Sequence, residues 1–370
     1  MTIRLVALLA LLVPFAACRG PRAAGDGPGL CTHVRAQRQL QGTELCEDVW
    51  SCRRPPGGRF DRAGLHRLAP CALTTGPVVL YLPGMHMNGE LPVQSPRNDL
   101  RLYLAAAGVR TWGLDYRTHT VPAGATPADL ADLGRWDAAV FEDDAAWAVD
   151  FVRAADPGPL VLAGFSYGAG LAYRLAARSD TRPERLLVLD GVHGAGRDVP
   201  GSGPAIDVGG SRLPWDLRQS LLALVILDPA TTSPLAGYAT AGAALADVLY
   251  TAPSFGGDGG LANTRDGVSD IRVLARLLRG YDRWWPRPAL ATSAPSPRGE
   301  LPVLAFASTR FGDAWVERVR SSAHAFGGES AVVRPLPRYG HLDVLVGRRA
   351  ARDVFAPALA WLGNPSASAP

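Results

Sequence analysis

The sequence predicts an α/β fold in which a mostly parallel central sheet carries helices on both faces. Short apolar runs typical of buried strands alternate along the chain with longer segments of helical spacing, and turns rich in glycine and proline separate them. The composition is that of an ordinary globular protein, with 47% hydrophobic and 19% charged residues among 370. No unit of 20 to 50 residues repeats and no heptad pattern persists, which excludes solenoids and coiled coils.

Five apolar runs are predicted as the main strands: 78–82, 109–114, 160–163, 185–189 and 301–307. Helical spacing follows at 98–107, 138–154, 171–178 and 313–326, and a last short run at 331–334 precedes a final helix. In such sheets the chemistry takes place at the carboxyl ends of the strands, so the loops after these runs hold the candidate residues.

The charge balance narrows the possible functions. The chain has 38 basic and 34 acidic residues, a net charge of +4, which does not fit a polybasic protein, so no nucleic-acid partner is expected. Every basic residue is arginine. Without lysine, Schiff-base enzymes, Ser-Lys dyads and phosphate-loop NTPases are excluded.

The strongest motif is Gly164-Phe165-Ser166-Tyr167-Gly168, which lies between a predicted strand and a predicted helix. A strand, the pattern Gly-x-Ser-x-Gly and a helix form a nucleophile elbow, a turn so sharp that side chains at the two glycines would strike neighbouring elements. The motif predicts Ser166 as a nucleophile exposed at the top of the sheet.

A serine hydroxyl is a weak nucleophile at neutral pH, so a histidine must accept its proton. Only His193, His324 and His341 follow Ser166 in the chain. His193 comes too early for an acid to precede it, and His324 falls in a predicted helix where a solvated surface histidine is expected. His341 lies in a turn after the last strand and is the predicted base.

The histidine in turn requires an acid that orients it. Asp313 follows the strand at 301–307 and is the preferred acid. Asp190 is the rival, because it ends the strand at 185–189 and related folds also place the acid there. Two backbone N–H groups should stabilise the oxyanion, and we expect them from Tyr167, directly after the nucleophile, and from Met85 in the loop after 78–82.

These motifs resemble the α/β-hydrolase superfamily over residues 77–192 and 300–362. The resemblance implies a serine hydrolase that needs no metal or cofactor and cleaves carboxylic esters of small molecules through an acyl-serine intermediate. Gly-x-Ser-Tyr-Gly and Leu189-Asp190-Gly191-Val192 are also similar to exported aminopeptidases, which leaves a peptidase acting on short peptides as an alternative. A catalytically silent envelope-binding protein of the same fold is a third.

The core does not require residues 193–299, which we expect to form a cap inserted over the active site. An apolar run at 221–227 and a helix at 270–278 lie within this segment. Aromatic residues follow that helix, but packing of the cap explains them as well as substrate binding does.

The first residues resemble an export signal. Arg4 precedes an apolar run at 5–17, whose 13 residues suit a signal peptide, because a bilayer span requires about 20. Ala16-Ala17-Cys18 resembles the site where bacterial lipoproteins are cleaved and acylated. We therefore expect a lipid anchor on Cys18, a tether over 18–30 and a location in the cell envelope; with a plain secretory signal, the protein would be secreted.

Four further cysteines, Cys31, Cys46, Cys52 and Cys71, lie together in an N-terminal segment at 31–76. An even set without a Cys-x-x-Cys pair predicts two disulfides in an oxidising compartment rather than a zinc site. Their pairing stays open, as three connectivities are possible. A disordered tail is expected at 363–370.

Overall fold

The computed structural model describes residues 31–40, 43–72, 74–194, 202–208, 213–251, 260–293, 295–297 and 300–363. The predicted signal peptide, Cys18 and the tether lie outside the described residues, as does the tail beyond Gly363.

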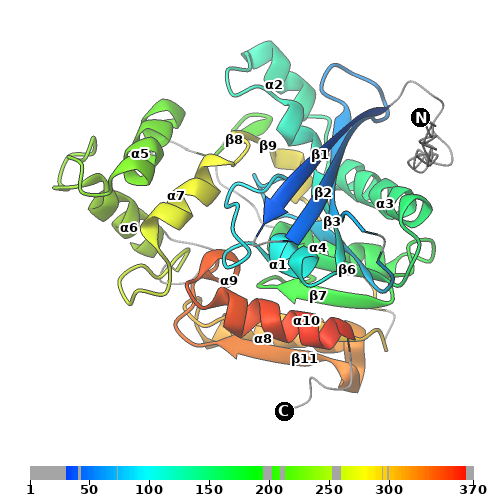
Figure 1. Cartoon of the computed structure of the whole chain (residues 1–370). Coiled ribbons are helices and arrows are strands. Elements are labelled where there is room, and N and C mark those ends of the chain that lie inside the picture. Colours follow the sequence, from blue (N-terminus) through cyan, green and yellow to red (C-terminus); the bar gives the residue numbers. More distant parts are fainter. Residues whose placement is uncertain are drawn as a thin grey trace, which may run out of the picture.

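A nine-stranded sheet in the order β1-β2-β3-β5-β4-β6-β7-β10-β11 forms the centre of the molecule (Figure 1). The six strands β5, β4, β6, β7, β10 and β11 run parallel to one another. The pairs β1–β2, β2–β3 and β3–β5 are antiparallel. The strands are β1 Cys31–Leu40, β2 Thr43–Arg53, β3 Arg62–Pro70, β4 Val78–Leu82, β5 Arg110–Asp115, β6 Leu160–Phe165, β7 Arg185–Leu189, β10 Val303–Ser308 and β11 Val332–Leu336. The predicted α/β fold with a mostly parallel sheet is confirmed.

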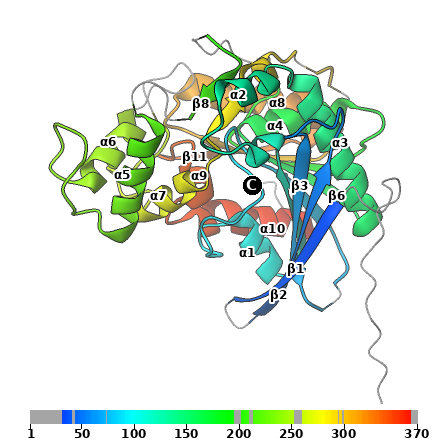
Figure 2. The same cartoon turned by 90° about the horizontal axis from the view of Figure 1, so that it is seen from above.

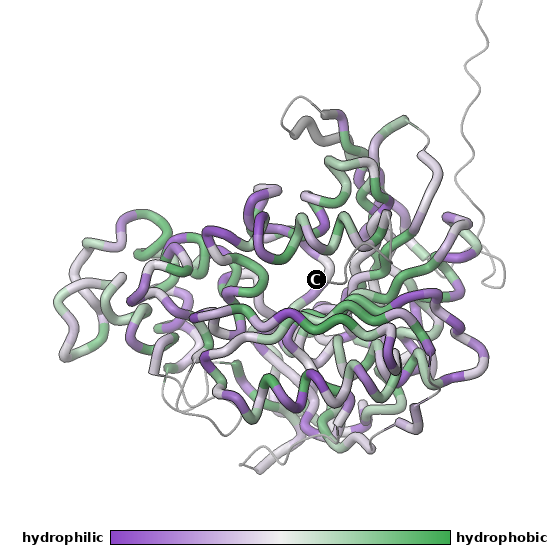
Figure 3. Tube along the Cα trace, turned by 90° about the horizontal axis from the view of Figure 1, so that it is seen from below, coloured by the Kyte–Doolittle hydropathy of each residue, from purple (hydrophilic) through white to green (hydrophobic). Residues whose placement is uncertain are grey.

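Helices cover both faces of the sheet. On one face lie α3 Ala138–Ala155, α4 Tyr167–Ala177 and α8 Asp313–Gly327, and on the other lie α1 Leu100–Ala106 and α10 Ala356–Gly363 (Figure 2). Alternate residues of the buried strands face the two layers, so Val78 and Leu80 contact one hydrophobic core and Val79 the other. The central strands are accordingly hydrophobic along their length, whereas the helices around them carry polar stretches (Figure 3).

Shorter helices lie in the connections. They are the 3₁₀ turns η1 Arg117–Thr120, η2 Arg287–Leu290 and η3 Gly328–Ser330, the helices α2 Pro127–Leu133 and α9 Asp343–Val346, and the π turn η4 Ala351–Phe355. None of the helices in the described part of the chain is long and apolar enough to cross a bilayer.

The N-terminal segment 31–76 contains three strands that sequence reasoning did not predict. They continue the sheet on its antiparallel side, where Trp50 of β2 stacks on Trp112 of β5 with ring centroids 5.0 Å apart. Disulfides join Cys31 to Cys52 and Cys46 to Cys71. The four cysteines thus form two bridges, as their even number predicts, and the structure supplies the pairing.

A second set of elements lies between β7 and β10, within the predicted insertion at 193–299. It contains a small sheet of β8 Ala205–Asp207 and β9 Trp284–Pro286, together with the helices α5 Trp215–Leu227, α6 Ala241–Thr251 and α7 Ile271–Arg279. The three helices form a lobe beside the main sheet (Figures 1 and 2). Asp270 caps the start of helix α7, where its carboxylate accepts a hydrogen bond from the N–H of Arg272, and Gly280 caps the end.

Candidate active site

Ser166 lies at the tight turn between strand β6 and helix α4. Its backbone has a φ of 54° and a ψ of −116°, a conformation that is costly for any residue with a side chain. The serine N–H donates to the carbonyl of Leu189, 3.1 Å away, and the serine carbonyl accepts from Ala169 and Gly170. The turn is therefore fixed by backbone bonds on both sides, and Ser166 is half-buried.

Glycine is required around this turn for steric reasons. A Cβ at Gly164 would collide with the carbonyl oxygen of Gly168, and one at Gly168 with the carbonyl oxygen of Leu82. Gly191, which the sequence analysis noted only as part of a resemblance, is also required, because a Cβ there would strike Ala169. Its place directly after Asp190, at the end of a strand, is the signal that could have found it.

His341 and Asp190 form a buried hydrogen-bonded pair. The imidazole Nδ1 donates to Asp190 Oδ2 at 2.6 Å, and the two residues are 4% and 0% exposed. The carboxylate accepts three further bonds: Oδ1 from the Ser308 N–H at 2.7 Å and from Trp315 Nε1 at 2.8 Å, and Oδ2 from Ser308 Oγ at 2.7 Å. Four donors thus compensate for the buried acid and fix its orientation.

This geometry favours Asp190 over Asp313, the acid preferred from the sequence. Asp313 lies exposed in the first turn of helix α8, whereas the imidazole Nδ1 of buried His341 bonds to Asp190. Helix α8 contributes Trp315 instead, whose indole N–H holds the Asp190 carboxylate. The rival acid of the sequence analysis therefore takes the position beside the histidine.

Strand pairing explains how residues far apart in the chain meet. Phe165 on β6 pairs with Leu189 on β7, so Ser166 and Asp190, the next residues, both follow the carboxyl ends of adjacent parallel strands. His341 follows β11 at the same edge, and its ring stacks on Phe165 with centroids 4.6 Å apart. The elbow and the His341–Asp190 pair thus lie at one end of the sheet.

Comparisons with known proteins address the fold. No family model and no curated protein matches the sequence. Among solved structures, a protein from Sulfolobus solfataricus described as a "putative lipase" aligns with a TM-score of 0.73 and 23% identity, over 86% of this chain and 94% of that one. The chain has the α/β-hydrolase fold. At that identity the likeness establishes the fold alone.

Two esterases are among the other matches. One from Thermogutta terrifontis has a TM-score of 0.48 and 16% identity, and covers 90% of this chain and 99% of its own. A cold-adapted esterase from an Arctic intertidal metagenomic library has a TM-score of 0.43 and 14% identity, over 88% of this chain and 95% of its own.

In an α/β-hydrolase fold the oxyanion donors come from the residue after the nucleophile and from the loop after an earlier strand. The predicted donors occupy such positions, because Tyr167 begins helix α4 and Met85 lies two residues beyond the loop's first, Pro83. Neither N–H donates a hydrogen bond to another residue in the described part of the chain. Gly84 lets this loop lie on the nucleophile strand, since a Cβ there would come within 2.9 Å of the Phe165 ring.

Three further histidines of the chain, His86, His193 and His324, make structural contacts. His324 is exposed on helix α8 and bonds through Nδ1 to the Gly328 carbonyl at 2.9 Å. His193 packs beside Tyr173, and burial lowers its pKa. His86 is buried beside the Met85 loop and bonds to the carbonyl of Asp282. Sequence reasoning overlooked Asp282, whose short loop after α7 carries no recognisable motif.

Proposed function

We propose that this protein is a serine hydrolase that cleaves carboxylic esters through an acyl-Ser166 intermediate. The observation that carries the proposal is the conjunction of a strained, glycine-flanked Ser166 with the buried His341–Asp190 pair at the same end of the sheet. The carboxylate that accepts from His341 is itself fixed by Ser308 and Trp315, as the orienting acid of a catalytic triad should be.

The roles follow from the chemistry of acyl transfer. Ser166 Oγ attacks the ester carbonyl carbon while His341 Nε2 accepts the hydroxyl proton, and Asp190 stabilises the resulting imidazolium through Nδ1. The N–H groups of Met85 and Tyr167 stabilise the negative carbonyl oxygen. The bond to the leaving alcohol then breaks, and His341 gives its proton to that alcohol. Water attacks the acyl group in the same way, which releases the acid and restores the Ser166 hydroxyl.

The segment 193–299 is the cap of this enzyme, and 77–192 and 300–362 form its catalytic core. Two backbone bonds from the core to the insertion support the role of the insertion as a cap. The His341 N–H donates to the Gly260 carbonyl at 2.8 Å, and the Leu342 N–H donates to the Leu261 carbonyl at 2.7 Å. The insertion therefore contacts the loop that carries the base. An insertion so placed is suited to control access to Ser166.

Export and anchoring belong to the same proposal. The bonds Cys31–Cys52 and Cys46–Cys71 favour an oxidising compartment outside the cytoplasm. We propose that the mature chain begins at Cys18 with a lipid on its thiol, and that 18–30 tethers the catalytic domain to a membrane.

The test is hydrolysis of p-nitrophenyl esters and of aminoacyl p-nitroanilides by the wild type, Ser166→Ala and the exposed control Ser220→Ala. We expect ester turnover by the wild type and the control, and a loss on the order of 10³-fold or more in Ser166→Ala. Turnover of the anilides alone would point to a peptidase. Absence of turnover with both substrates would favour the silent binding protein.

A further inference from the structure

Asp282 joins the insertion to two loops of the catalytic core. It lies two residues after Gly280, which ends helix α7, and its side chain is only 6% exposed. Its contacts reach the loop after β4 at 83–91, which we name the β4 loop, and the turn η1, which follows β5. One cap residue thus touches the segment that carries Met85 and a neighbouring turn.

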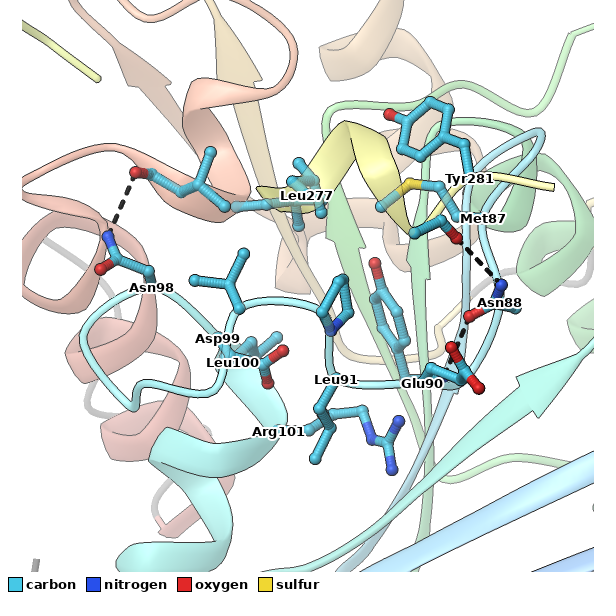
Figure 4. A pocket seen from close by; sticks show the side chains of 16 residues that line it. Met87, Asn88, Glu90, Leu91, Asn98, Asp99, Leu100, Arg101, Leu277 and Tyr281 are labelled. Carbon is cyan, nitrogen blue, oxygen red and sulfur yellow. Dashed lines mark hydrogen bonds between the residues drawn. The ribbon is translucent and has the colours of Figure 1, made fainter. Parts of the chain in front are cut away.

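The β4 loop is bound to Asp282 through main chain and side chain. The Asp282 N–H donates to the His86 carbonyl at 2.7 Å, and the Asp282 carbonyl accepts from His86 Nδ1 at 2.9 Å. Asn88 Nδ2 donates to Asp282 Oδ1 at 3.0 Å and to the Gly280 carbonyl at 3.2 Å. Figure 4 shows the Asn88 side chain directed toward the end of α7. His86 and Asn88 both lie within three positions of Met85 along the chain.

The turn η1 completes the set of donors around the carboxylate. Thr118 Oγ1 donates to Asp282 Oδ2 at 2.9 Å, and His119 Nδ1 lies 2.9 Å from Oδ1. The second ring nitrogen of His119 lies 3.6 Å from a carboxylate oxygen of Glu90, also in the β4 loop. Burial would lower the pKa of His119, but the bonds to Asp282 and Glu90 raise it to about 11, so the ring is cationic at neutral pH.

The β4 loop depends on these contacts for its conformation. His86 has a φ of 64°, a left-handed conformation that a non-glycine residue keeps only when its surroundings impose it. Burial lowers the pKa of His86 to about 4, so the ring stays neutral and can donate Nδ1–H to the Asp282 carbonyl. A cavity of about 50 Å³ lined by Met87, Leu277 and Tyr281 leaves the loop incompletely packed beside α7 (Figure 4).

We propose that Asp282 is a positioning residue that fixes the β4 loop, and with it the Met85 N–H, at the place where the oxyanion develops. The proposal rests on the proposed function and assigns the cap a part in catalysis besides covering the site. An oxyanion donor acts through its geometry, and a shift of about 1 Å can lower the rate about 10²-fold.

The test compares Asp282→Asn with the wild type. The substituted amide keeps the size of the side chain, but its NH₂ replaces one of the two acceptor oxygens that Asn88, His119 and Thr118 share. We expect kcat for a p-nitrophenyl ester to fall about 10- to 100-fold with little change in KM. Affinity for a trifluoromethyl ketone, which forms a tetrahedral oxyanion, should fall in parallel with kcat.

Asp156→Asn is the matched control. The Asp156 side chain is 6% exposed and accepts bonds from Arg67, Arg110 and Trp112 near the start of β5, at the other end of the sheet, so its loss should lower the melting temperature and leave kcat and ketone affinity unchanged. Unchanged kcat in folded Asp282→Asn would refute the positioning role, as would a rise in KM alone. If Asp282→Asn fails to fold, Asn88→Ala should show a smaller fall in kcat, again with little change in KM. Normal kcat in that variant would refute the proposal.

The two proposals fail in different ways. If the wild type neither turns over esters nor reacts with the ketone, the proposed function fails. If the wild type is active and Asp282→Asn matches it, only the positioning role fails.

Discussion

At the scale of single residues, Asp190 occupies a site built for a carboxylate. Its φ of 49° is unusual for a non-glycine residue, its side chain is fully buried, and donors from β10 and α8 satisfy both oxygens. Removing such a charge from water is costly without compensation, and three donors besides His341 provide it. Because these partners fix the acid, the acid can fix the imidazole.

Exchanging each of the two candidate acids for asparagine tests this assignment. Asp190→Asn presents an amide N–H where Nδ1–H of His341 requires an acceptor, so we expect ester kcat to fall about 10³- to 10⁴-fold. Asp313→Asn, in an exposed helical turn, should keep kcat within about threefold of the wild type. Circular dichroism of both variants is the folding control, and the reverse order of effects would restore Asp313 as the acid.

The sequence indicates two members of the proposed triad more clearly than the third. Ser166 has a motif with a steric cause, and His341 follows from chain order and its loop after the last strand. The acid has neither a motif nor a unique place in the chain order, because both β7 and β10 are followed by an aspartate, Asp190 and Asp313. Only tertiary packing decides between them: the backbone turn at Asp190 and the donors Ser308 and Trp315 form a carboxylate site that no spacing rule describes.

At the scale of elements, the parallel half of the sheet could be predicted and the antiparallel half could not. Strands β4, β6 and β7 are buried on both faces and appear as nearly continuous apolar runs. Strand β2 instead contains Glu47 and Asp48, which are 4% and 6% exposed. Their partners, His66 and Arg67, lie on β3, so the charges can be buried only once the two strands pair.

His66 makes the stability of this antiparallel region dependent on pH. Burial would lower its pKa, but hydrogen bonds to Asp115 and Glu47 and the charge of Asp115 raise it from 6.5 to about 9. The folded state therefore binds more protons than the unfolded state between pH 6.5 and 9, and stability must fall as pH rises through this window. We expect His66 to contribute about 3 kcal/mol below pH 6.5 and to lose this contribution by about pH 9.

Urea unfolding of the wild type and His66→Gln at pH 6.5, 7.5 and 9 measures this contribution. The difference in unfolding free energy between the two proteins should be largest at pH 6.5 and close to zero at pH 9. His119 also makes stability depend on pH, but it does so in both proteins and therefore cancels in the difference. The exposed His324→Gln serves as control and should follow the wild type. A difference that stays constant with pH would mean that His66 acts by packing alone.

At the scale of the whole molecule, the chain combines the proposed catalytic core, the proposed cap and an N-terminal extension with two disulfides. The described chain enters the sheet at β1, on its outer antiparallel edge, whereas the elbow lies at the end of the central strand β6 (Figure 1). A tether at 18–30 would therefore attach at the edge of the sheet, with four strands between β1 and β6, although at the same end of the strands as the elbow.

Cys18→Ser tests the anchor. A lipid on Cys18 should place the wild type in the detergent phase after Triton X-114 extraction, because each buried methylene contributes about 0.8 kcal/mol. The variant should partition into the aqueous phase or stay unprocessed, with ester turnover per folded molecule unchanged. Equal partitioning of the two, or a mature N-terminus mapped downstream of Cys18, would leave a freely secreted protein.

The most direct test of the central claim is covalent labelling with a fluorophosphonate, followed by peptide mass spectrometry. A fluorophosphonate reacts only with a serine whose hydroxyl is activated by a base, so it reports on the triad without any assumption about substrate. We predict one adduct per molecule, on the peptide that contains Ser166, lost in Ser166→Ala and strongly slowed in His341→Ala and Asp190→Asn. Absence of an adduct in folded wild-type protein, or an adduct on another serine, would contradict the account.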